Sequence, residues 1–215
     1  SWFGSNTERG FAYGKVNDGS NNMVDRLFVV SRSAGNMVRV VDATTGDDAG
    51  SLTMDPIISG GLIVINDVEV TYDGKILASN VVGSTVTAQD WKVYMWDNLT
   101  STPVLAMTYV VPPVTPNTRL GDKFRVTGNF YNNTAIIWAA DAANAKVYKF
   151  SMSGGAFNPV PEIITLSNNA FGGSASVAPL PDGSFYYNAA GKNVMKYSAT
   201  GIVIDTIPGT VIATG

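Results

Sequence analysis

The chain has 215 residues, 45% hydrophobic and 14% charged, with a net charge of −3, which suits one domain with a sizeable core. An acidic chain lacks the basic face that nucleic-acid binding requires, and no apolar run reaches the length of a transmembrane segment. Cysteine and histidine are absent, which excludes disulfides, thiolate or histidine metal sites and Cys- or His-dependent catalysis.

Short β-branched and aromatic runs alternate with turn residues along the whole chain, and no long segment has helical periodicity. The first predicted group of strands covers residues 7–13, 27–31, 38–42 and 51–54. The second covers residues 66–70, 75–80, 92–96 and 104–110. The third covers 122–127, 135–139, 146–150 and 162–166, and the fourth covers 174–178, 184–188, 193–197 and 202–207.

The four groups have the same internal order, with an inner strand, a tight turn, two paired middle strands and an outer strand. Tight turns are predicted where Gly follows Asp, at Gly74 and Gly183. Corresponding valines of the third strands recur at intervals of about 50 residues, which is typical of propeller blades. A sandwich of irregular strands would not require this repeated order.

We therefore expect an all-β fold, a β-propeller of four-stranded antiparallel blades forming a single domain over residues 1–215. The blades are predicted at roughly 7–57, 58–112, 121–168 and 171–208, and residues 209–215 resemble the start of a further inner strand. Four blades can close a ring, but the ending also suggests a partial propeller or one completed by a second chain. Uncovered blade faces would favour self-association.

Four segments carry a resemblance to known proteins: TERGFAY at residues 7–13, RLFVVSR at 26–32, VVDATTG at 40–46 and SGGLIVINDVEVTYDGKILASN at 59–80. They resemble a family of secreted bacterial β-propellers of unknown function. The cassette V-x-V-x-D-x-x-T-G at Val38–Gly46 is also similar to surface-layer and quinoprotein-like propeller repeats. The resemblance implies a propeller fold and an extracellular, cell-surface or periplasmic location with the signal peptide removed. It implies no catalytic residue.

Charged residues occur at matching places in the predicted inner strands. Alignment of these strands places Gly10, Asp67, Lys123 and Ser174 in one register, and Ala12, Glu69, Arg125 and Ser176 two residues further on. Residues two apart on a strand share a face, so both sets are expected near a central channel. The predicted ligand site at the channel mouth consists of Arg9, Asp67, Glu69, Asp122, Lys123 and Arg125.

Two other interpretations of these charges stay open. In the first, they pair across adjacent blades, for instance Glu69 with Arg125, and only solvate the channel. In the second, Asp67 and Glu69 act as the carboxylate pair of a glycoside-cleaving enzyme, which needs carboxyls about 5–10 Å apart. Any two acids at i and i+2 on a strand meet that separation, so the pattern is not specific.

Aromatic residues recur at strand positions and suit either sugar stacking or packing between blades. They are Trp91, Tyr94, Trp96, Trp138, Tyr148, Tyr186 and Tyr187, whereas Trp2 and Phe3 lie outside the repeats and are expected to be exposed. No Ca²⁺-binding loop is present, and no cofactor or metal is expected. The sequence favours a non-enzymatic extracytoplasmic binding or scaffold module for a carbohydrate or a surface protein. The alternatives are a polysaccharide lyase or hydrolase that uses the channel carboxylates, and a structural subunit of a larger assembly.

Overall fold

The computed structural model describes residues 4, 6–33, 35–83, 86–114 and 117–208, and over these residues the chain forms strands and turns but no helix. The all-β class and the antiparallel four-stranded sheets expected from the sequence are confirmed. The expectations for Trp2, Phe3 and residues 209–215 lie outside the described residues. Across the described part of the chain, no helix has the length and apolar character needed to cross a membrane.

Each of the four sheets is built from strands that follow one another in the sequence. Sheet 1 contains β1 (Glu8–Asn17), β2 (Met23–Ser31), β3 (Met37–Asp42) and β4 (Asp48–Ser51), hydrogen-bonded in that order. Sheet 2 contains β5 (Ile63–Val70), β6 (Ile76–Val81), β7 (Gln89–Trp96) and β8 (Val104–Val111), also in that order.

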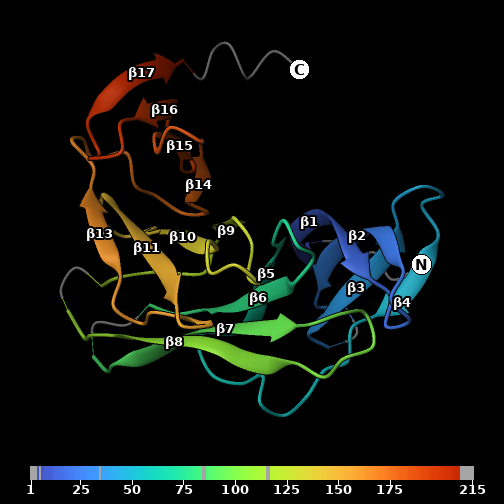
Figure 1. Cartoon of the computed structure of the whole chain (residues 1–215). Helices are drawn as coiled ribbons and strands as arrows, with labels where there is room; N and C mark the ends of the chain where they lie inside the picture. The colour runs from blue at the N-terminus through green and yellow to red at the C-terminus, as the bar shows by residue number, and fades with distance from the viewer. Residues whose placement is uncertain (1–3, 5, 34, 84–85, 115–116, 209–215) are drawn as a thin grey trace.

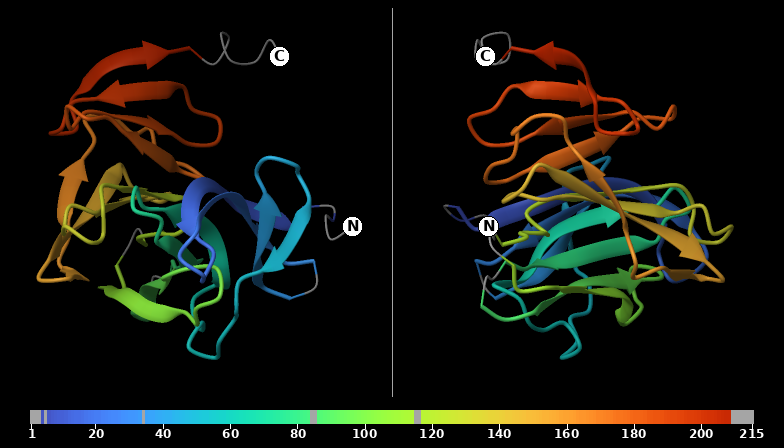
Figure 2. Two further views of the ribbon diagram at one scale, coloured as in Figure 1. Left: turned by 45° about the vertical axis from the view of Figure 1, so that its right-hand side comes forward. Right: turned by 90° about the vertical axis from the view of Figure 1, so that its left-hand side faces the viewer.

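Sheets 3 and 4 follow the same plan. Sheet 3 contains β9 (Phe124–Thr127), β10 (Ile136–Ala140) and β11 (Lys146–Ser153), and β11 pairs on its outer side with both β12 (Ala156–Phe157) and β13 (Glu162–Thr165). Sheet 4 contains β14 (Ser176–Pro179), β15 (Phe185–Asn188), β16 (Val194–Tyr197) and β17 (Val203–Ile207). Figure 1 shows the sheets following one another from β1–β4 to β14–β17, and Figure 2 shows this order from two other sides.

Every predicted strand overlaps an observed one. The largest displacement is at β4, predicted at 51–54 and observed at Asp48–Ser51. The turn after β3 is tight because the Asp42 carboxylate accepts the backbone N–H groups of Thr44 and Thr45, and Gly46 adopts a φ of 77°. Pairing therefore resumes at once, with Asp48 opposite Val41. The short β12 is not predicted.

Three apolar clusters lie between successive sheets, and the alternation of side chains along the middle strands produces them. On β6, Ile76 and Ala78 belong to the cluster shared with sheet 1, whereas Leu77 belongs to the cluster shared with sheet 3. On β10, Ile137 packs toward sheet 2 and Trp138 toward sheet 4. Sheets 2 and 3 are thus buried on both faces, which explains their nearly continuous hydrophobic runs.

The first strands of the sheets contact one another in sequence, β1 with β5, β5 with β9 and β9 with β14. The approach of β1 to β5 is very close, since a Cβ built on Gly10 would lie 2.5 Å from the Cα of Asp67. Only glycine fits at this position. The first strands therefore bring charged residues from distant parts of the sequence together.

Candidate functional site

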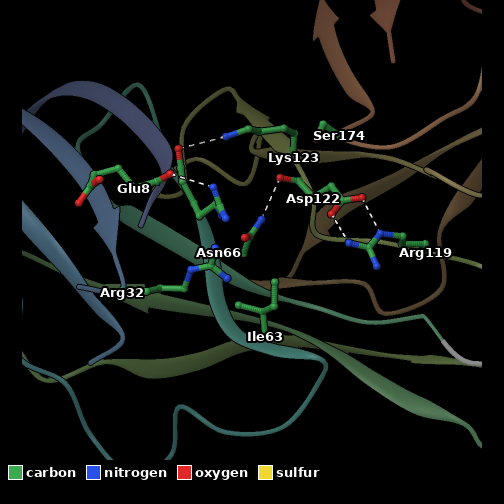
Figure 3. Close-up of a pocket in the computed structure, with 9 residues that line it drawn as sticks. Glu8, Arg32, Ile63, Asn66, Arg119, Asp122, Lys123 and Ser174 are labelled. Carbon is green, nitrogen blue, oxygen red and sulfur yellow. Dashed lines mark hydrogen bonds and ion pairs between the residues drawn. The ribbon is translucent and has the colours of Figure 1, made fainter. Parts of the chain in front are cut away.

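Two adjoining cavities lie along the first strands. The larger, about 510 Å³, is called the arginine cavity and is shown in Figure 3. It is lined by Glu8, Arg9, Arg32, Ile63, Asn66, Arg119, Asp122, Lys123 and Ser174. The smaller, about 290 Å³, is called the carboxylate cavity and is lined by Phe11, Asp67, Glu69, Lys123, Arg125, Ser174 and Ser176. Lys123 and Ser174 line both, so the two cavities are neighbours.

Asp67 on β5 is a buried carboxylate that is held by Phe124, the first residue of β9, and by Lys123, which directly precedes β9. Its Oδ1 accepts a charged hydrogen bond from Lys123 Nζ at 3.1 Å, and its Oδ2 accepts the backbone N–H of Phe124 at 2.8 Å. The side chain is only 2% exposed. Desolvation raises the pKa of Asp67 to about 6, although Lys123 and the Phe124 N–H act in the opposite direction.

Glu69 lies two residues further along β5 and forms an ion pair with Arg125 of β9. The Glu69 side chain is 10% exposed and that of Arg125 is 49% exposed, so the carboxylate is buried while its partner reaches solvent. Desolvation raises the pKa of Glu69 to about 8, against the attraction of Arg125, and the nearby Asp67 charge raises it further.

The polar floor of the arginine cavity joins sheet 2 to the segment before β9. The Nδ2 group of Asn66 donates to the backbone carbonyls of Gly121 and Asp122, each at 3.0 Å. Arg119 holds Asp122 through two parallel hydrogen bonds of 2.7 Å. This bidentate geometry neutralises Asp122 and fixes both side chains in place (Figure 3).

Arg9 and Arg32 form the remaining cationic part of this cavity. The backbone register pairs Glu8 with Ser31. Arg9 and Arg32, which follow these two residues in the sequence, therefore lie at the same end of sheet 1. Arg9 Nη1 donates to the Glu8 carbonyl at 3.3 Å. Partial burial and, to a smaller degree, repulsion from Arg9 lower the pKa of Arg32. Among the described residues, neither guanidinium is within salt-bridge distance of a carboxylate.

Among the described lining residues, Glu8 is the one acid outside these ion pairs, and its carboxylate has other partners. It accepts hydrogen bonds from the Thr7 hydroxyl at 2.8 and 2.9 Å, from the Gly4 N–H at 3.3 and 3.4 Å, and from the Ser31 hydroxyl at 3.3 Å. In Figure 3 the Arg32 guanidinium extends toward Asn66, whereas the Glu8 carboxylate is directed away from it.

The six residues predicted as a channel-mouth site are distributed over the two cavities. Arg9 and Asp122 line the arginine cavity, Asp67, Glu69 and Arg125 line the carboxylate cavity, and Lys123 lines both. The ion pair of Glu69 with Arg125 suggested by the sequence is present.

The predicted register is wrong on β1. Phe11 lines the carboxylate cavity, whereas Ala12 is buried in the cluster between sheets 1 and 2, and Gly10 faces the backbone of Asp67. The pairing of β1 with β2 is irregular between Glu8 and Phe11, at the place where the observed register differs from the predicted one.

Three further charged lining residues escape the prediction because they lie outside the central parts of the first strands. Arg32 follows β2, Arg119 precedes β9, and Glu8 is the first residue of β1. Arg32 could have been found from antiparallel pairing alone, since the end of a second strand lies beside the beginning of the first.

The recurrent aromatics mostly serve packing. Trp91, Tyr94, Trp96, Trp138, Tyr148 and Tyr187 are all buried in the clusters between sheets. Tyr186 is partly exposed, with Lys196 Nζ 5.9 Å from its ring centre. Trp138 also borders a third cavity of about 460 Å³, together with Tyr72 and Pro181.

Over the described residues, no group of three or more Asp, Glu, His or Cys side chains is arranged to hold a metal ion. The acidic side chains of the two cavities instead contact cations, hydroxyls and backbone N–H groups. The chemistry of the site is therefore that of paired charges and guanidinium groups.

Comparisons with known proteins give a structural neighbour. No family model matches the chain, and no curated protein matches it. Among the solved structures that match is the crystal structure of a DUF4623 family protein from Bacteroides eggerthii, with a TM-score of 0.69 and 18% sequence identity. The match covers 94% of this chain and 45% of that one, so the chain spans less than half the length of this neighbour. At this identity the likeness concerns the fold alone.

Proposed function

We propose that the four sheets are consecutive blades of a β-propeller. The repeated strand order, the contacts between successive first strands and the apolar clusters between sheets support this arrangement. In such a fold the first strands would line the central channel, and residues of the first strands line both cavities.

On this scaffold the chain acts as a non-enzymatic, extracytoplasmic binding module for a carbohydrate or a surface protein. The observation that carries the proposal is that first strands from all four sheets contribute to one lining, through Phe11, Glu69, Arg125 and Ser176. Convergent polar groups in a concave site are the usual arrangement for small-ligand recognition. The extracytoplasmic location rests on the resemblance of the sequence to secreted propellers.

Binding to a glycan panel tests this function. Glu69→Ala and Arg125→Ala should each weaken, by about tenfold, the binding of a glycan that the wild type binds, because each removes one polar group from the cavity lining and leaves the other without the partner that positions it. Glu162→Ala, which removes an exposed carboxylate on β13 paired with Lys149, is the matched control and should bind like the wild type. Equal binding by all four proteins would remove the cavity as the site.

The second candidate is a polysaccharide lyase or hydrolase that uses the same carboxylates. It is favoured by the raised pKa values of Asp67 and Glu69 beside a cavity, a combination that recurs at catalytic sites. Against it, both carboxylates already bind cations. Glycan turnover that is abolished by Asp67→Asn or Glu69→Gln would establish the enzyme in place of the binding module.

The third candidate is a structural subunit of a larger assembly. It is favoured by the large aromatic side chains exposed on β1, with Phe11 55% and Tyr13 59% accessible. The measurement that tests it is the state of association in solution.

A further inference from the structure

The arginine cavity has a cationic surplus in a protein whose net charge is −3. Arg119 is neutralised by Asp122, and Lys123 by Asp67. What remains is Arg9 and Arg32 beside Glu8, whose carboxylate accepts hydrogen bonds from Thr7, Gly4 and Ser31. Two guanidinium groups therefore line the cavity without a carboxylate of the described chain to bind.

The two guanidinium groups influence one another. Partial burial and, to a smaller degree, repulsion from Arg9 lower the pKa of Arg32. A guanidinium presents a planar set of N–H donors that matches the two oxygens of a carboxylate or sulfate. An oxyanion placed between the two arginines would satisfy these donors and remove the repulsion.

We propose that the arginine cavity binds an oxyanion, a carboxylate or a sulfate group carried by a polar ligand. For the glycan of the proposed function, on which this inference rests, the oxyanion is the carboxylate of a uronic acid or a sulfate ester. Arg9 and Arg32 bind its oxygens, while Ser174 offers a hydroxyl at the boundary with the carboxylate cavity. Among the described residues of the lining, Ile63 is the only apolar side chain, so recognition is polar.

Calorimetric titration with three oligosaccharides of matched length, one neutral, one uronic and one sulfated, tests the proposal. The wild type should bind at least one acidic oligosaccharide about tenfold more tightly than the neutral one, with affinity falling as salt is added. Arg9→Gln and Arg32→Gln should each lose this preference. Arg32→Lys, which keeps the charge but not the planar fork, should retain part of it.

Lys15→Gln is the matched control. Lys15 is an exposed residue of β1 outside both cavities, so this change removes the same charge from the same strand as Arg9→Gln. Its preference should equal that of the wild type. An equal loss in Lys15→Gln would show that only the net charge matters and would overturn the proposal.

The three oligosaccharides also separate this inference from the proposed function. Equal binding of neutral and acidic oligosaccharides by the wild type would overturn the oxyanion site and leave the binding module in place. If no oligosaccharide binds, sodium sulfate is titrated while backbone amide NMR signals are followed. Shifts confined to the surroundings of Arg9 and Arg32, and absent in Arg32→Gln, would support the oxyanion site without the glycan, whereas their absence from the wild type would overturn it.

Discussion

At the scale of single residues, the acids of β5 show how burial competes with ion pairing. Asp67 and Glu69 each contact a cation, yet the pKa of each is raised, because the loss of hydration outweighs the attraction of partners that reach solvent. A carboxyl group whose pKa is higher in the folded than in the unfolded chain takes up a proton on folding. Its contribution to stability is therefore complete below the unfolded pKa and lost as the pH rises through the folded one.

For Glu69 this window runs from about pH 4.5 to about pH 8. Glu69→Gln, which resembles the protonated acid, should match the wild type in thermal stability near the lower limit and become more stable than it toward the upper limit. The expected gain is on the order of a few kcal/mol, since one pKa unit corresponds to about 1.4 kcal/mol. Thermal unfolding followed by circular dichroism across this range measures the difference.

Glu162→Gln, which removes an exposed carboxylate, should show no such growing difference. If the ion pair with Arg125 dominated instead, Glu69→Gln would lose stability relative to the wild type as the pH rises. That opposite sign would contradict the dominance of desolvation at Glu69.

At the scale of elements, strand order was predictable and strand orientation was less so. The hairpin of β10 and β11 follows from its apolar run, its small-residue turn and its alternation, and these are local signals. Whether Gly10, Phe11 or Ala12 points into the cavity depends on the irregular pairing of β1 with β2 and on the close approach of β5. Those are tertiary constraints, so the charged first-strand residues could be predicted but the register of β1 could not.

The loop between β10 and β11 depends on one buried side chain. The Asp141 carboxylate is fully buried and accepts the backbone N–H groups of Arg119, Ala143 and Asn144 at 2.8–3.2 Å. Its backbone carbonyl accepts the Tyr187 hydroxyl of sheet 4 at 2.9 Å. One residue thus connects the segment before β9, the β10–β11 turn and the next sheet.

Asp141→Ala should reduce the free energy of unfolding by about 2–4 kcal/mol, because three partly buried N–H groups lose the carboxylate that accepts them. Chemical denaturation measures this change. Asp182→Ala is the comparison, since Asp182 caps an exposed turn by accepting the N–H and hydroxyl of Ser184, and its loss should destabilise the chain less than the loss of Asp141. Equal costs for the two variants would contradict the structural role assigned to Asp141.

At the scale of the whole molecule, the four sheets are not equivalent. Sheets 2 and 3 are covered on both faces by the apolar clusters, whereas over the described residues sheets 1 and 4 each contribute to one cluster only. The other side of β1 exposes Phe11 and Tyr13, and these rings stand opposite Val29 and Leu27 of β2. Exposed aromatic rings on a sheet face favour contact with a further sheet.

We expect the average mass measured by light scattering to rise with protein concentration as this face is covered by a second copy. Tyr13→Ser, which changes this face without altering the lining of either cavity, should keep the chain monomeric at the same concentrations. Tyr131→Ser, which removes a 91% exposed ring from a turn outside the sheets, should associate like the wild type. A constant monomer mass for the wild type would rule out a subunit that assembles through β1.

The strictly consecutive pairing of strands also determines how the chain can mature on the ribosome. Sheet 1 can complete its hydrogen bonds as soon as β4 has emerged, but Tyr94 and Trp96, which cover its inner face, are synthesised only with β7. Until then Phe28, Val38 and Val40 remain accessible to chaperones and to other nascent chains. The rate of translation between β4 and β7 therefore determines how long the nascent chain exposes the apolar face of sheet 1.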